Sequence, residues 1–145
     1  MDHHLILRVV TKILIAPILL YGLYVQFHGD YSPGGGFQAG VIFAVAFILY
    51  GLVFGLQNLR TRFSDRLVHR LIALGLLLFA GTGIVGLIKG SNFLDYNPLG
   101  PTVIQGQHWG IIAVELGVGI TVFAVMMAIY YSFAGRPPRL DDKDW

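Results

Sequence analysis

The chain has no cysteine among its 145 residues, and only 12% of them are Asp, Glu, Lys or Arg. Without cysteine it can form no disulfide, no covalent haem attachment and no iron–sulfur cluster of its own. His3 and His4 are the only metal-ligand pair of note, and no third histidine lies near them in the sequence. We therefore expect an exposed N-terminal end rather than a zinc site, and no metal or other cofactor.

Motifs for nucleotide binding and for catalysis are also missing. No Gly-Lys-Ser/Thr follows a glycine-rich segment, which excludes a P-loop. Gly34, Gly36 and Ala39 match the dinucleotide fingerprint G-x-G-x-x-A, but they follow a long apolar run rather than a strand, and the expected ribose-binding acid is replaced by Gln57. The serines form no recognisable set with histidine and aspartate. The sequence therefore predicts a protein that is not an enzyme.

Hydrophobic residues make up 55% of the chain, and the charges are expelled from four long apolar segments. These segments span residues 9–27, 37–56, 71–88 and 110–133. At about 1.5 Å of rise per residue, each can cross a hydrocarbon core of about 30 Å, the third with help from its flanks. The pattern predicts an all-α integral membrane protein, residues 1–145 forming a single unit of four transmembrane helices. No signal-peptide cleavage site follows the first segment, so we expect it to be retained.

Positive charges gather on one side of the predicted membrane topology. Lys89 lies alone on one side, and nine basic residues lie on the other: Arg8, Lys12, Arg60, Arg62, Arg66, Arg70, Arg136, Arg139 and Lys143. This asymmetry predicts that both termini are cytoplasmic. Arg8 and Lys12, one helical turn apart, can extend towards the lipid headgroups. Because topology accounts for the basic residues, no nucleic-acid partner is needed to explain them.

A glycine-rich turn, residues 28–37, joins the first two apolar segments and is predicted to face outward. It contains Pro33 followed by Gly34, Gly35 and Gly36, and then Phe37. Successive glycines accept positive φ and expose bare backbone, so another helix or another chain can approach closely. The spacings Gly36-x-x-x-Gly40 and Gly51-x-x-x-Gly55 predict close packing at both ends of the second span. Gln38 and Thr82 are expected to form interhelical hydrogen bonds.

Glu115 is the only charged residue deep inside an apolar segment. An ionised carboxylate there costs several kcal/mol unless it is protonated, paired or hydrated, so it marks a proton or ion path. A structural hydrogen bond at a helix interface is the alternative, because Glu115 lies about six residues inside its segment. His108, seven residues earlier, falls on the same helix face. His28 and Asp30 in the turn are candidates for attracting cations or relaying protons, although a solvated loop explains them equally well.

One intramembrane carboxylate on four helices is too little for an autonomous exchanger, since secondary transporters use internal repeats and several ionisable groups. No convincing repeat relates the two halves of this chain, while its 19 glycines favour surfaces that meet other helices. The loop at 89–108 also carries apolar residues, and we expect it to lie on the membrane surface or against another subunit. The sequence therefore predicts a subunit of a larger membrane complex.

Three segments carry a family resemblance: the turn at 27–40, Asp95-Tyr96, and the helix segment from Glu115 to Gly119. Together they resemble the MnhB family, which forms one of the small membrane subunits of the multi-subunit Mrp-type Na⁺/H⁺ antiporters, and the resemblance covers essentially the whole chain. It implies a bacterial or archaeal cytoplasmic-membrane complex that exchanges Na⁺ for H⁺ and supports sodium tolerance and pH homeostasis. It also implies that other, larger subunits carry the main proton-translocating residues, that Pro33 to Phe37 is a functionally sensitive element, and that Glu115 is a candidate for the ion path.

Three other functions remain as alternatives. Similar modules occur in ion-translocating membrane hydrogenases, so a hydrogenase-complex subunit is one of them. A stand-alone, homo-oligomeric, proton-coupled exporter is another, although such exporters often need a weak charge bias and this chain has a strong one. A quinone- or haem-binding redox subunit is the third, and it is disfavoured because paired intramembrane histidines are absent from the sequence.

Overall fold

The computed structural model describes residues 5–29 and 33–136, and everything within those ranges is helix, turn or loop. The long helices are α1 (Leu5–Phe27), α2 (Gly36–Phe54), α4 (Asp65–Ile88) and α5 (Val103–Ala134). A short helix, α3 (Leu56–Arg62), links α2 to α4, and a 3₁₀ turn, η1 (Asn97–Leu99), lies between α4 and α5. All four long helices are apolar and long enough to cross a membrane, and the described part of the chain is all-helical apart from its connections, as predicted.

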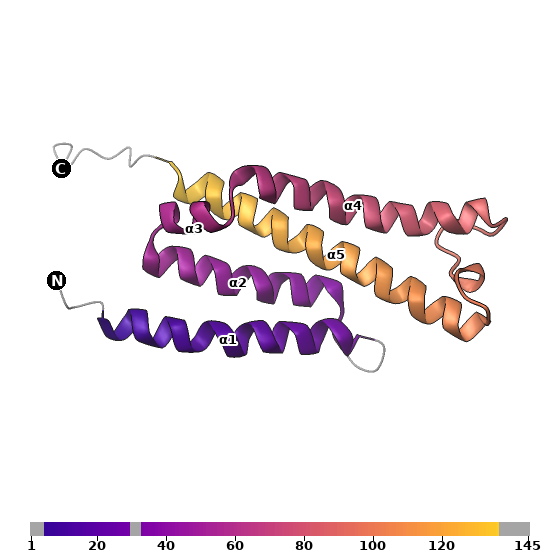
Figure 1. Cartoon of the computed structure of the whole chain (residues 1–145), viewed down its shortest axis with the longest axis horizontal. Helices are drawn as coiled ribbons and strands as arrows, with labels where there is room; N and C mark the ends of the chain where they lie inside the picture. The colour runs from indigo at the N-terminus through magenta and orange to yellow at the C-terminus, as the bar shows by residue number, and fades with distance from the viewer. Residues whose placement is uncertain (1–4, 30–32, 137–145) are drawn as a thin grey trace.

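The long helices form two hairpins that pack side by side (Figure 1). Helix α5 lies between α4 and α2 and contacts both extensively, whereas α1 packs mainly on the far side of α2. The first residue of α1 and the last residue of α5 lie at the same end of the bundle (Figure 1). The loop between α4 and α5 lies at the other end, whereas the end of α1 and the start of α2 lie part-way along α5 (Figure 1).

Residues without bulky side chains bring the helices together. A Cβ atom added to Gly40 of α2 would lie 2.6 Å from the backbone oxygen of Gly119 in α5. One added to Gly75 of α4 would lie 2.7 Å from the backbone oxygen of Gly117. These contacts are much closer than a side chain permits, so α5 approaches both neighbours backbone to backbone. Thr82 was expected to form an interhelical hydrogen bond. Its hydroxyl instead donates to the backbone oxygen of Leu78, one turn earlier in the same helix, at 2.8 Å.

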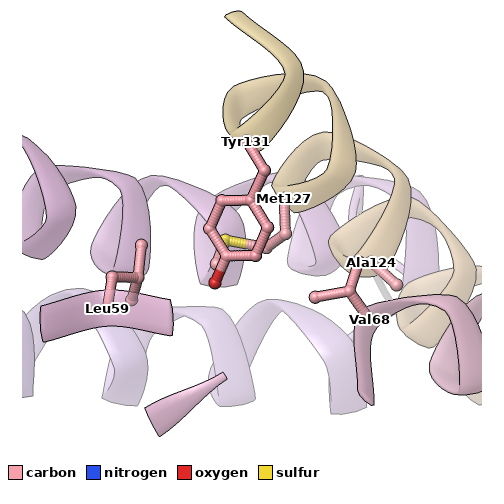
Figure 2. Packing of buried hydrophobic residues seen from close by; sticks show 5 residues of the cluster. All are labelled: Leu59, Val68, Ala124, Met127 and Tyr131. Atoms are coloured by element: carbon pink, nitrogen blue, oxygen red, sulfur yellow. The ribbon is translucent and has the colours of Figure 1, made fainter. Parts of the chain in front are cut away.

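The end of the bundle that carries α3 contains a compact apolar cluster (Figure 2). Its buried members are Leu59, Val68, Ala124, Met127 and Tyr131. The Tyr131 hydroxyl donates to the backbone oxygen of Phe63 at 2.7 Å, which ties α5 to the connection before α4. Helix α4 begins at Asp65, where Ser64 is the N-cap and its side chain accepts from the Leu67 backbone N–H at 3.3 Å.

The second span is closely packed at only one of its two glycine pairs. Gly36 and Gly40 both abut the backbone of α5, as expected. At the other end, Gly51 is buried against Leu59 and Tyr130, but nothing lies within 4 Å of a Cβ placed on Gly55. The φ of Gly55 is 97°, so its role is to break the chain between α2 and α3 rather than to pack. The prediction of packing at Gly55 was therefore wrong.

The loop between α4 and α5 folds back on the two helices that it joins. The Phe93 ring occupies the space that a side chain on Gly83 would need, and the Tyr96 ring does the same at Gly110. Lys89 donates through Nζ to the backbone oxygen of Pro98 at 2.7 Å. Part of the apolar surface of this loop is thus covered within the chain itself, although Phe93 remains 49% exposed.

Helix α5 is longer at its N-terminal end than the apolar segment that predicted it, because it starts at Val103 and is capped by the Thr102 side chain. The α1–α2 hairpin is shorter and ends alongside the middle of α5 (Figure 1). Glu115 therefore lies twelve residues, or about 18 Å, from the start of its helix, rather than about six residues. The turn between α1 and α2 lies beside Glu115.

Single cysteine substitutions can test the orientation that the charge distribution predicts. Thr61 on α3 and Asn92 between α4 and α5 are both exposed. Helix α3 and the α4–α5 loop lie at opposite ends of the bundle (Figure 1). We expect Asn92→Cys to react with a membrane-impermeant maleimide in intact cells, and Thr61→Cys to react only after permeabilisation. Labelling of Thr61→Cys from outside would refute the predicted topology.

Candidate functional site

The turn between α1 and α2 closes around the carboxylate of Glu115. A Cβ placed on Gly29 would lie 2.5 Å from Glu115 Oε1 and 3.0 Å from Oε2. One placed on Gly35 would lie 2.7 Å from Oε1. The two glycines on either side of the turn therefore contact one carboxylate of α5, and a side chain at either position would displace it. This arrangement, which we call the glycine–carboxylate site, consists of Gly29, Gly35, Gly36 and Glu115.

Local backbone geometry explains why glycines form this site. Gly35 has φ 107°, a conformation that side-chain-bearing residues rarely adopt. Its N–H donates to the Val25 backbone oxygen at 3.1 Å, which holds the turn against the end of α1. A Cβ on Gly34 would lie 2.9 Å from that same oxygen. At Gly36 a Cβ would overlap the backbone oxygen of Glu115, so α2 starts in direct contact with α5.

The carboxylate lies at the N-terminal end of α2. Gly35 is the N-cap of this helix and provides no side-chain acceptor. The first backbone N–H groups of a helix have no acceptor within the helix, and the aligned peptide dipoles place about half a positive charge there. The positive end of the α2 dipole therefore lies beside the Glu115 carboxylate.

The two histidine candidates lie in different places. His28 immediately precedes Gly29 and is partly buried, and its ring stacks on Tyr24 with centroids 4.7 Å apart. His108 is exposed on α5, seven residues before Glu115 and thus about 10 Å away along the helix axis. His28 therefore belongs to the glycine turn, whereas His108 lies towards the N-terminal end of α5. Asp30 lies outside the described residues.

The glycine motif is divided between buried and exposed positions. Gly35, Gly36 and Gly40 are buried against the neighbouring helices. Pro33 is exposed, and the Phe37 side chain is 61% exposed on the outer surface of α2. The glycines therefore shape the site, while Pro33 and Phe37 face the surroundings of the chain.

Gln26 was not singled out from the sequence, although it lies beside this site. Its side chain is only 6% exposed, and its Oε1 would lie 2.8 Å from a Cβ on Gly119, one helical turn after Glu115. Gln26 also lines an apolar cavity of about 260 Å³ whose walls include Leu116 and Gly119. Gln26 is a lone amide near the end of an apolar segment, as Gln38 is. The same sequence feature that marked Gln38 could therefore have marked Gln26.

No group of three or more His, Cys, Asp or Glu that could hold a metal ion occurs within residues 5–29 and 33–136. Among the described residues, the site thus brings the backbone of Gly29, Gly35 and Gly36 against the carboxylate-bearing residue Glu115. Such a group can bind and release a proton, or contact a monovalent cation together with backbone carbonyls and water. The fold and this site define an all-helical protein with four helices able to cross a membrane and, within the described residues, the Glu115 carboxylate enclosed among them.

Comparison with known proteins identifies the family. Residues 6–128 match the family model described as a domain related to the MnhB subunit of Na⁺/H⁺ antiporter. A Staphylococcus haemolyticus protein named as antiporter subunit mnhB2 is 34% identical over 141 residues, covering 92% of this chain and 96% of that protein. The Staphylococcus aureus (strain Newman) protein of the same name is 35% identical over 137 residues, with the same coverage. The chain belongs to the MnhB family of antiporter subunits, as its resemblance implied.

Proposed function

We propose that this chain is a non-catalytic subunit of a multi-subunit Na⁺/H⁺ antiporter in a prokaryotic cytoplasmic membrane, and that Glu115 lies on the ion path. The observation that carries the proposal is the enclosure of the Glu115 carboxylate by Gly29 and Gly35 at the start of α2. The glycine turn brings main-chain groups, rather than apolar side chains, against this carboxylate, and main-chain groups can share a cation with it.

In this proposal the glycine–carboxylate site holds one proton or contacts one Na⁺ at a time. The N-terminus of α2 stabilises the ionised carboxylate, and protonation or cation contact neutralises it. His28 and the more distant His108 are proposed to exchange protons between Glu115 and the outer end of the bundle, because the two ring nitrogens of an imidazole can accept and donate a proton. Asp30 is proposed to attract cations towards the same turn.

The neighbouring subunits are proposed to complete the path, because this chain supplies few other polar groups within its spans. Its long helices expose many large apolar side chains, which suits contact with lipid and with partner helices. We propose that Pro33 and Phe37, on the exposed side of the glycine turn, contact such a partner. The main proton-translocating residues then belong to the larger subunits, and sodium tolerance and pH homeostasis are properties of the whole complex.

A component of a complex and a stand-alone exporter differ in what expression of the chain alone achieves. We expect no Na⁺-dependent proton flux in inverted vesicles from an antiporter-deficient strain that expresses this chain alone. Expression with the membrane proteins encoded beside it should restore the flux, and omission of this chain from that set should abolish it. Flux from the chain alone would favour the stand-alone exporter. Assembly with hydrogenase components instead would favour the role in a hydrogenase complex.

A further inference from the structure

A second site lies at the opposite end of the bundle, far from Glu115. A groove of about 480 Å³ runs between the beginning of α1, the end of α2 and the short helix α3. Two cationic side chains, Lys12 and Arg62, lie at this groove. The rest of its lining is mostly apolar and aromatic: Ile15, Ala46, Phe47, Tyr50, Leu59 and Phe63. The groove therefore combines positive charge with an apolar wall.

The two arginines of α3 have different roles. Arg60 is held within the chain, because its Nε lies 3.5 Å from Asp65 Oδ1 and its guanidinium packs over the Tyr131 ring, 5.3 Å from the centroid. Arg62, two residues later, has neither a hydrogen-bond nor an ion-pair partner within residues 5–29 and 33–136. Its guanidinium is therefore available to bind an anion in the groove.

Lys12 provides the second charge from a different helix. Its Nζ lies 5.7 Å from the centre of the Phe54 ring, so the ammonium is directed across the end of α2 rather than away from the bundle. Lys12 also belongs to an apolar helix, where a cation near one end is placed at headgroup level. Lys12 and Arg62 thus bring two cations from separate helices to the same groove.

We propose that this groove binds one anionic phospholipid of the cytoplasmic leaflet. The phosphate lies between Lys12 and Arg62, and one acyl chain lies along Ile15 and Phe47. Charge complementarity selects an anionic headgroup, and basic pockets between membrane helices on the cytoplasmic side are suited to such headgroups. The apolar wall selects a lipid over a free phosphate ion, since an inorganic anion gains nothing from aromatic surface. The bound lipid would fasten α1 to the α2–α3 connection.

Photocrosslinking of the assembled complex in nanodiscs tests this proposal. The probe is a phosphatidylglycerol that carries a diazirine in one acyl chain, and the crosslinked peptides are identified by mass spectrometry. We expect labelling within residues 46–63 that excess phosphatidylglycerol displaces and phosphatidylcholine does not. Competition by phosphatidylcholine to the same extent would indicate a non-selective lipid shell and would overturn the proposal.

Paired substitutions provide the matched control. Lys12→Gln with Arg62→Gln should reduce labelling at least about tenfold, because each positive charge near an anionic lipid surface has a substantial effect on binding. Arg66→Gln with Arg70→Gln removes the same charge from exposed positions on α4 and should change labelling less than about twofold. Lys12→Arg with Arg62→Lys keeps both positive charges and should retain the labelling. This result would show that a chain altered at both positions still folds. An equal loss in both glutamine pairs would overturn the proposal in favour of general surface attraction.

Two further measurements exclude other occupants. Displacement of the probe by inorganic phosphate as effectively as by phosphatidylglycerol would mean that the groove binds free anions, which overturns the lipid assignment. Removal of residues 137–145, which include three aspartates, should leave labelling unchanged. An increase after this truncation would identify the acidic tail as the occupant and would equally overturn the proposal.

Discussion

Replacement of Glu115 by glutamine is expected to reduce Na⁺-dependent proton exchange at least about tenfold while the complex stays assembled. Glutamine keeps the shape of the side chain, so the turn at Gly29 and Gly35 can still close around it. It cannot ionise, so it neither carries a proton nor neutralises a cation. The measurement is cation-dependent proton flux in inverted vesicles across a series of pH values, with complex content determined in the same membranes.

The matched variant for this experiment is Glu115→Asp, which keeps the charge but shortens the side chain by one methylene. We expect it to retain part of the exchange with a displaced pH profile, because the carboxylate moves away from the turn. If Glu115→Gln exchanges ions at the normal rate with an unchanged pH profile, Glu115 is an interface residue and the conducting role is wrong. Family membership would not be affected by that result.

Introduction of a single methyl group at Gly36 is expected to destabilise the fold by about 3 kcal/mol. A Cβ there would overlap the backbone oxygen of Glu115, and neither α2 nor α5 can yield at that point without separating. Gly36→Ala should therefore weaken the α2–α5 contact and expose the carboxylate. The free energy of unfolding, measured by SDS titration of the purified chain, provides the test.

Gly81 provides the control, since nothing lies within 4 Å of a Cβ placed there on α4. Gly81→Ala should leave the free energy of unfolding unchanged or raise it by up to about 1 kcal/mol, because alanine favours the helix. Similar stability of Gly36→Ala and the wild type would show that α2 and α5 are not in backbone contact at Gly36. The enclosure of Glu115 would then have to be abandoned.

The glycine turn illustrates how far sequence reasoning reached and where it stopped. The absence of side chains from Gly34 to Gly36 predicted that another backbone would approach closely, and this is confirmed. The sequence left open whether that backbone belonged to another chain. It is α5 of the same chain, because the short α1–α2 hairpin ends beside Glu115 (Figure 1). Nothing in the spacing of residues 29–36 relates them to position 115.

The depth of Glu115 shows the same limit. Hydropathy places the start of the last span near Gly110, because the preceding loop contains glycine and proline. Helix α5 begins instead at Val103, where Thr102 caps it and where η1 and Tyr96 pack against its first turns. Polar and apolar residues alternate irregularly in this stretch, so tertiary contacts with the folded-back loop decide the helix start.

The sequence by itself determined the class of this protein: four apolar helices, a strong charge asymmetry and a lone intramembrane carboxylate. These follow from local composition, since the bilayer acts on each segment separately and requires apolar side chains and satisfied backbone groups. Only the tertiary structure decided that Gly29, Gly35 and Gly36 meet Glu115, that Gln26 lies beside them, and that Lys12 and Arg62 share a groove. Such pairings depend on which helices pack together and on how far each is shifted along the axis of the bundle. Close backbone contact between positions that are distant in the chain produces no periodic pattern in the sequence.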